Sequence, residues 1–118
     1  MNKNYIFIKI KKSIYRLLIN DINYLQHDGD YIIIHHNKGR NTILNRGINL
    51  NSLGNSFIKC HRSYIINTNK IREIEITKDG DTIFLENTTS IPMSNTYKKS
   101  IINNINYIYN ENSISNSK

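Results

Sequence analysis

Residues 57–67 read Phe57-Ile58-Lys59-Cys60-His61-Arg62-Ser63-Tyr64-Ile65-Ile66-Asn67 and hold the most informative pattern in the chain. Apolar side chains flank a basic and hydroxyl-bearing centre, His61-Arg62-Ser63. Charged side chains are rarely buried without partners, so we expect this centre at a strand end or in a loop. The run therefore predicts a strand over residues 57–60 that leads into a polar, basic loop.

Short alternating or β-branched segments on both sides of this run predict a meander of antiparallel strands. Turn signals separate them at Asp28-Gly29-Asp30, Asn37-Lys38-Gly39-Arg40 and Asp79-Gly80. Pro92 cannot donate to a strand ladder, so the last strand is expected at a sheet edge. The predicted strands cover residues 5–10, 14–19, 21–26, 31–35, 42–44, 57–60, 70–77, 82–86 and 90–93.

Two segments switch to helical spacing. Apolar residues in 48–53 predict a short internal helical turn, which Gly54 ends. Near the C-terminus, apolar residues recur every three or four positions after Ser94, which can cap a helix. This helical face consists of Tyr97, Ile101, Ile105 and Ile108. The predicted fold is therefore mainly β, with a short internal helix and a C-terminal helix.

The length and charge of the chain narrow its class. The 118 residues suit one domain, which we place at residues 1–109, followed by a flexible polar tail at 110–118. Sixteen Lys and Arg against nine Asp and Glu give a net charge of +7. A basic surface concentrates phosphate groups near it, so nucleic acid or an anionic membrane surface is the expected partner.

Cysteine usage and hydropathy predict a cytoplasmic protein. The single cysteine, Cys60, cannot form an intramolecular disulfide. Near the N-terminus, Lys9 and Lys11 interrupt the apolar residues, so no signal-peptide core is present. No apolar run reaches the roughly 18 residues that a membrane helix needs, so no membrane insertion is expected.

The sequence gives little support for a catalytic site or a metal site. Cys60 and His61 are adjacent on a strand and should point to opposite faces, which favours a buried thiol over a nucleophile. Only mixed or intermolecular disulfides then remain open to it. The spacing of the four histidines with Cys60 matches no common metal pattern, so no metal or other cofactor is expected. We therefore expect that the protein is not an enzyme.

The acidic residues gather on one predicted hairpin, which we expect to be solvated and to face away from the basic surface. They are Glu73, Glu75, Asp79, Asp81 and Glu86.

Residues 57–67 closely resemble the F-x-x-x-H-R-S-Y-x-x-N signature of the LytTR-type DNA-binding domain of bacterial response regulators. The resemblance extends over about residues 6–102 in the same order of elements. Its supporting pieces are Asp21–Leu25 with Gly29–Tyr31, the helix at 48–53, Asn69-Lys70-Ile71, Ile91–Ser94 and Tyr97-Lys98-Lys99.

The resemblance implies an elongated antiparallel β structure of small packed sheets, whose loops on one side enter the major groove of duplex DNA. It implies base contacts from Arg62, Asn95 and the Asp30–Tyr31 region. For His61 and Asn67, the residues alone favour a structural role at strand ends over base contact. The remaining implied DNA contacts are His61, Ser63, Ser94, Lys98 and Lys99.

The resemblance leaves two features open. Asn95 stands where the family most often has Arg, so altered specificity is expected there. Most family members also carry a receiver or membrane region, and neither is visible here. Control is then expected from expression, a regulatory partner protein or self-association, with two copies on direct repeats. The alternative is a β-scaffold interaction module that binds RNA, a partner protein or an anionic surface.

Overall fold

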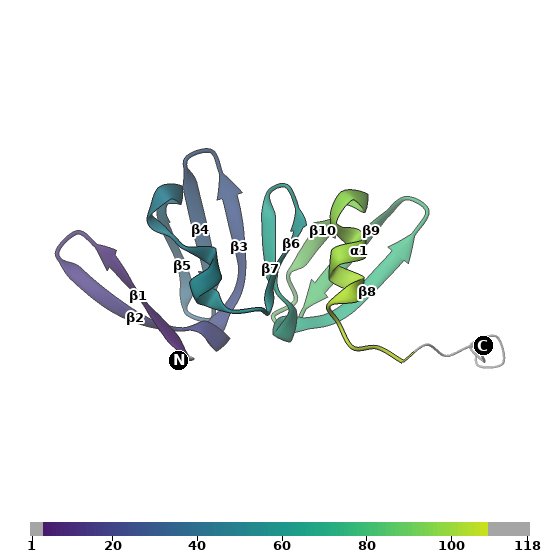
Figure 1. The fold of residues 1–118 in the computed structure, drawn as a ribbon, viewed down its shortest axis with the longest axis horizontal. Coiled ribbons are helices and arrows are strands. Elements are labelled where there is room, and N and C mark those ends of the chain that lie inside the picture. Colours follow the sequence, from purple (N-terminus) through teal and green to yellow (C-terminus); the bar gives the residue numbers. More distant parts are fainter. Residues whose placement is uncertain (1–3, 109–118) are drawn as a thin grey trace.

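The computed structural model describes residues 4–108, which form an elongated β structure with one α-helix (Figure 1). Its extents are 59 × 30 × 24 Å. The ten strands in this part of the chain form antiparallel sheets of two, five and three strands, arranged in a row along the long axis. The predicted mainly β, elongated fold is confirmed. The predicted polar tail, residues 110–118, lies outside the described part.

The first sheet is the hairpin of β1 (Tyr5–Ile10) and β2 (Ser13–Leu18). Alternation along β1 turns Ile6, Ile8 and Ile10 toward the neighbouring sheet. A short 3₁₀ helix, η1 (Ile19–Asp21), then leads into the second sheet.

The second sheet has the strand order β5-β4-β3-β7-β6. Its connection from β5 to β6 contains the predicted internal helix, which is 3₁₀ rather than α, and Gly54 ends it with a φ of 95°. The elements of this part are β3 (Ile22–Asp28), β4 (Tyr31–His36), β5 (Gly39–Leu44), η2 (Asn45–Gly47), η3 (Leu50–Leu53), β6 (Phe57–His61) and β7 (Tyr64–Asn67).

The third sheet has the order β10-β9-β8, so β10 with Pro92 lies at an edge as predicted. The only α-helix among residues 4–108, α1, packs against β6 of the second sheet. No helix in this described part is long and apolar enough to cross a bilayer. The elements here are η4 (Thr68–Lys70), β8 (Ile71–Thr77), β9 (Gly80–Leu85), β10 (Ser90–Met93) and α1 (Asn95–Asn103).

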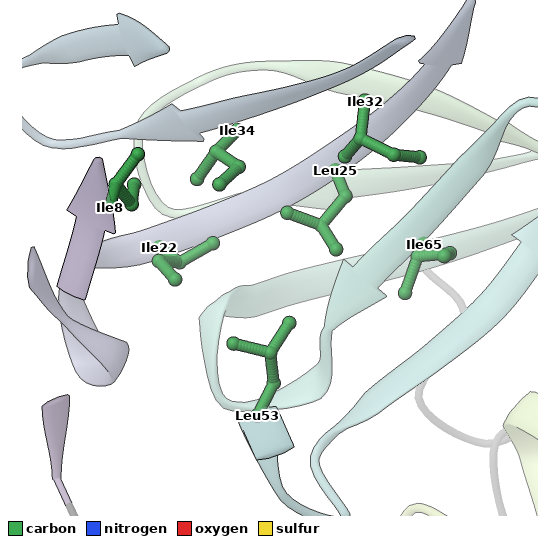
Figure 2. Close-up of a cluster of buried hydrophobic side chains, with 7 residues drawn as sticks. All are labelled: Ile8, Ile22, Leu25, Ile32, Ile34, Leu53 and Ile65. Atoms are coloured by element: carbon green, nitrogen blue, oxygen red, sulfur yellow. The ribbon is translucent and has the colours of Figure 1, made fainter. Parts of the chain in front are cut away.

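Two buried clusters hold these sheets together, and β7 takes part in both. Ile65 faces the first cluster, whereas its neighbour Ile66 faces the second, because successive side chains of a strand point to opposite faces. The first cluster (Figure 2) consists of Ile8, Ile22, Leu25, Ile32, Ile34, Leu53 and Ile65. The second cluster consists of Cys60, Ile66, Ile83, Leu85, Ile91, Met93 and Ile101.

The C-terminal helix is shorter than the sequence predicted. It ends at Asn103, and the side chain of Asn104 donates a 2.8 Å hydrogen bond to the carbonyl of Ser100. Asn side chains compete with the backbone for hydrogen bonds and so favour helix ends. Ile101 is fully buried, but Ile105 lies beyond the helix and Ile108 is 94% exposed. The predicted four-residue apolar face is therefore wrong in its second half.

Candidate nucleic-acid interface

The central Arg-Ser pair forms the tip of the β6–β7 hairpin. Arg62 and Ser63 make the two-residue turn, with Arg62 exposed and Ser63 half-buried. Nδ1 of His61 accepts a 3.1 Å hydrogen bond from the backbone N–H of Ser63. His61 thus fixes the shape of the turn and keeps Nε2 for an outside partner. The prediction that this centre lies at a strand end is confirmed.

Asn67 has the structural role that the sequence favoured. It is 1% exposed, and its side-chain amide donates a 2.8 Å hydrogen bond to the carbonyl of Ile22. Its side-chain oxygen accepts a hydrogen bond from the N–H of Asn69. The last residue of the signature therefore ties β7 to the start of β3 and is not available to DNA.

Three separate loops meet along one long edge of the molecule, the upper edge in Figure 1. They are the β3–β4 turn, the β6–β7 turn and the start of α1. The N–H of His27 donates to the carbonyl of Ser63 at 2.8 Å, which joins the first two loops. The N–H of Ser94 donates to the carbonyl of Cys60 at 2.9 Å, which joins the third to the same hairpin. The β6–β7 hairpin is therefore the centre of the edge.

The first loop presents two predicted site residues. Asp30 and Tyr31 follow Gly29, whose φ of 61° lets the chain reverse between β3 and β4. Both residues are exposed, Tyr31 to 49%. The carbonyl of Asp30 accepts a 2.7 Å hydrogen bond from the N–H of Asn45, which anchors the loop to the end of β5.

The third loop presents Ser94 and Asn95 at the start of α1. Ser94 occupies the N-cap position, as predicted, but its side chain makes no capping hydrogen bond, so that part of the prediction is wrong. Its backbone is held by Cys60 instead. Asn95 and Lys99 are exposed. The hydroxyl of Ser94 and the N-terminal end of the helix consequently remain free to meet a phosphate.

Lys98 is held by a buried carboxylate. Its Nζ lies 3.1 Å from Oδ2 of Asp81, whose side chain is only 5% exposed. Asp81 also accepts a hydrogen bond from the N–H of Thr77. The sequence placed Asp81 on a solvated acidic hairpin, and this is wrong. Asp81 alternates with buried Ile83 and Leu85 along β9, and that period of two was the available signal.

A second unpredicted residue is Lys59 on β6. Its Nζ lies 5.5 Å from the ring centre of Tyr97, which is a cation–π geometry. Lys59 and Arg62 also line one hollow of about 310 Å³, together with His27 and Tyr64. Four of the other lining residues, Ile32, Leu50, Phe57 and Ile65, are apolar, so the hollow as a whole is not a polar anion site, although its two cations add to the basic charge beside the central turn.

The histidines mostly contact neighbouring side chains. Three of the four histidines of the second sheet contact an amide side chain: His35 contacts Gln26, His36 contacts Asn41, and His27 contacts Asn45. Within residues 4–108, no three His, Cys, Asp or Glu side chains gather as a metal site. Burial, together with nearby Arg40 and His36, lowers the pKa of His35 below its usual value.

Cys60 is fully buried, and burial raises the pKa of its thiol from 9.0 to about 12. Because the thiolate is the reactive form, we expect a maleimide at pH 8 to label native Cys60 roughly a hundredfold or more slowly than the urea-unfolded chain. The neutral thiol stabilises the fold fully below about pH 9, and this contribution declines as the pH rises further. Equal labelling rates with and without urea, measured by intact mass, would contradict this environment.

Removing the charge of Asp81 should release Lys98 toward DNA. Asp81→Asn keeps an acceptor for Thr77, and Lys98 is 34% exposed and can be hydrated, so we expect a stability loss of only about 1 kcal/mol or less. One added phosphate contact should steepen the dependence of log K on log salt by about 0.9. The measurement is fluorescence anisotropy on one duplex at several salt concentrations. Asp79→Asn, an equal charge change at the exposed turn of the same hairpin, is the control, and equal slopes for the two variants would refute the idea.

The molecule is a row of three small antiparallel sheets, and three exposed loops lie along one of its edges. This arrangement is that of a β-scaffolded binding domain. The model of the LytTr DNA-binding domain matches residues 12–106. The chain belongs to the LytTR family of DNA-binding domains, whose members act in transcription regulation.

The fold has a counterpart among solved structures. A LytTr DNA-binding domain of a response regulator from Bacillus cereus superposes with a TM-score of 0.69 at 21% sequence identity. The match covers 86% of this chain and 95% of that one. At this identity the likeness concerns the fold. No curated protein sequence matches the chain.

Proposed function

We propose that this domain binds duplex DNA sequence-specifically, through loops inserted in the major groove, and regulates transcription without catalysis. The observation that carries the proposal is the tethering of three loops along one edge by the β6–β7 hairpin. Loops in a row along a molecule 59 Å long suit a target that is itself long and repetitive, such as a duplex.

Base reading is assigned to the exposed tips of these loops. Arg62 can bond guanine O6 and N7 together, and Asn95 can bond adenine N6 and N7. In the first loop, Asp30 can accept from the amino group of cytosine, and Tyr31 lies exposed beside it. Asn95 brings no charge, so the third loop should prefer adenine and contribute less to affinity than an arginine would.

Phosphate contacts are assigned to the residues around the tips. Ser63 and Ser94 offer hydroxyls, and His61 offers Nε2. Lys99 is exposed, whereas Lys98 shares its charge with Asp81, so Lys99 should contribute more to the salt dependence. The edge thus combines base readers with phosphate anchors. Regulation would come from pairing of two copies on direct repeats or from a regulatory partner protein.

The test is selection of bound duplexes from a randomised DNA pool by the wild-type chain. An enriched motif with guanine and adenine positions matching Arg62 and Asn95 is the expected result. Recovery of duplexes with no common motif would refute sequence-specific reading. Competition of the enriched DNA with RNA of the same sequence checks the alternative partner, because A-form RNA hides its major groove. If the RNA competed better than the DNA, RNA and not DNA would be the target.

A further inference from the structure

The β1–β2 hairpin carries an exposed face that the DNA-reading edge does not use. Cross-strand pairing places Tyr5 opposite Leu18, Phe7 opposite Arg16 and Lys9 opposite Ile14, all on the side away from the first cluster. Phe7 is 55% exposed and Ile14 is 67% exposed. The outer hairpin face, as we call it, consists of Tyr5, Phe7, Lys9, Ile14, Arg16 and Leu18.

This face is apolar and basic together. Tyr5 and Phe7 meet edge to face at 5.6 Å between ring centres, and the guanidinium of Arg16 lies 5.8 Å from the ring centre of Tyr5. Residues 5–18 contain four basic side chains and no acidic one. Contiguous exposed aromatic and aliphatic side chains indicate a contact with protein, because phosphate groups give them nothing to bury against.

The opposite end of the molecule carries the complementary charge. Residues 71–86 contain five acidic side chains against two basic ones, and one of the five, Asp81, is buried and paired with Lys98. Glu73 and Glu75 are exposed on the face of β8 that looks away from the second cluster, opposite Phe84 and Thr82 of β9. β8 is the last strand of its sheet, and Figure 1 places it at the far end from the β1–β2 hairpin. We call Glu73, Glu75, Thr82 and Phe84 the acidic sheet face. One cation borders it, because the guanidinium of Arg72 lies 5.8 Å from the ring centre of Phe84.

We propose that the outer hairpin face of one copy docks on the acidic sheet face of a second copy bound next to it on the same DNA. The two faces lie at opposite ends, so the contact is head-to-tail and repeats in one direction. All reading loops share one long edge, so copies arranged end to end keep that edge toward a single duplex. The inference rests on the proposed function and adds the surfaces through which bound copies cooperate.

The size of the faces determines when the contact forms. A stable interface buries about 800 Å² per partner, which one two-stranded hairpin does not provide. The contact should therefore be weak between free copies. Binding to one duplex raises the effective concentration to the millimolar range, where a weak contact becomes populated. The expected behaviour is a monomer in solution and cooperative binding on DNA.

The length of the molecule predicts the spacing. A 59 Å long axis laid along a duplex covers about 17 base pairs at about 3.4 Å each. The first longer spacing that returns to the same side of the duplex is two helical turns, about 21 base pairs. The assay therefore compares duplexes with one selected site and with two sites in the same orientation, placed one, two or three turns apart.

The decisive variants exchange charge between the faces. Lys9→Glu/Arg16→Glu reverses the hairpin, Glu73→Lys/Glu75→Lys reverses the sheet, and a third protein carries all four changes. Wild type should bind two sites two turns apart about tenfold more tightly than independent sites would allow, within the usual range of coupling between sites. Each protein with only one reversed face should lose this cooperative gain, and the protein with all four changes should recover it. Affinity for a single site serves as the reference in every protein.

A control is Arg40→Glu, a charge reversal at the start of β5, where Arg40 pairs with His35 of β4 and belongs to neither face. It should keep the cooperative gain. Absence of a gain in wild type at every spacing, or loss without recovery in a four-fold variant that melts like wild type, overturns the docking contact. Single-site preference that persists in that case leaves the proposed function standing. Absence of any preferred single site removes the proposed function and this inference together.

Discussion

Replacing Ile66 with alanine is expected to destabilise the fold by about 2–5 kcal/mol, the usual cost of emptying a packed site. Ile66 is 0% exposed and is the β7 residue of the second cluster, where it meets side chains of β9, β10 and α1. Its removal leaves a cavity between the β6–β7 hairpin and the sheet that carries the third loop. Site-specific DNA binding should therefore weaken as well, although Ile66 lies away from the edge.

Urea unfolding at fixed temperature measures the first effect, because the midpoint shifts while the slope stays constant if only stability changes. Ile76→Ala is the matched control, since Ile76 on β8 is 55% exposed and should lose less than about 0.5 kcal/mol. Similar midpoints for the two variants would show that Ile66 does not pack in the second cluster. In that case β7 would not join the two clusters.

Much of the fold was predictable because its signals are local. The alternation of apolar residues in β1 and the Asp-Gly turns depend only on neighbouring residues. The same holds for the position of Pro92 at a sheet edge. The boundaries of the nine predicted strands differ from the structure by at most three residues, because tertiary pairing extends or shortens each strand. The sequence did not predict β7 (Tyr64–Asn67), which follows the central turn.

The parts that the sequence did not predict depend on contacts between distant segments. The C-terminal apolar spacing continues to Ile108, but the second cluster ends at Ile101, and Asn104 stops the helix. Asp81 reads as a solvated acid until its partner Lys98 is placed beside it by α1. The burial of Asp81 had a local signal in its alternation with Ile83 and Leu85, but its pairing with Lys98 and the end of the helix depend on the packing of α1 on β6.

The candidate site also combines features that the sequence predicted with features that only the structure shows. Arg62 and Ser63 stand out in the sequence because charge interrupts an apolar run, and the structure places them at a turn tip. Their union with the first and third loops depends on β3 lying beside β7 and on the hydrogen bond from Ser94 to Cys60. Residue identity therefore predicted which side chains are candidates, and topology determines that they share one edge.

Replacing Arg62 with alanine is expected to cost about 1–3 kcal/mol of binding to the selected site, or roughly 5- to 150-fold in Kd. The reason is the loss of a bidentate contact to guanine from the centre of the reading edge. The loss should concentrate on one base pair, so that substitution of that pair costs wild type as much as the mutation does and costs the variant little. Binding isotherms for wild type and variant on a panel of single-base substitutions measure this.

Two further variants separate base reading from charge. Arg62→Lys keeps the cation but cannot make the planar bidentate contact, so it should lose most of the preference while retaining the salt dependence. Arg40→Ala removes an exposed arginine from the β4–β5 hairpin and should leave the preference intact. Because Arg62 is exposed, its removal should shift stability by less than about 0.5 kcal/mol, so a binding loss is not a folding loss. An equal loss of affinity for every duplex in the panel would assign Arg62 to phosphate and move base reading to Asn95 and the Asp30–Tyr31 loop.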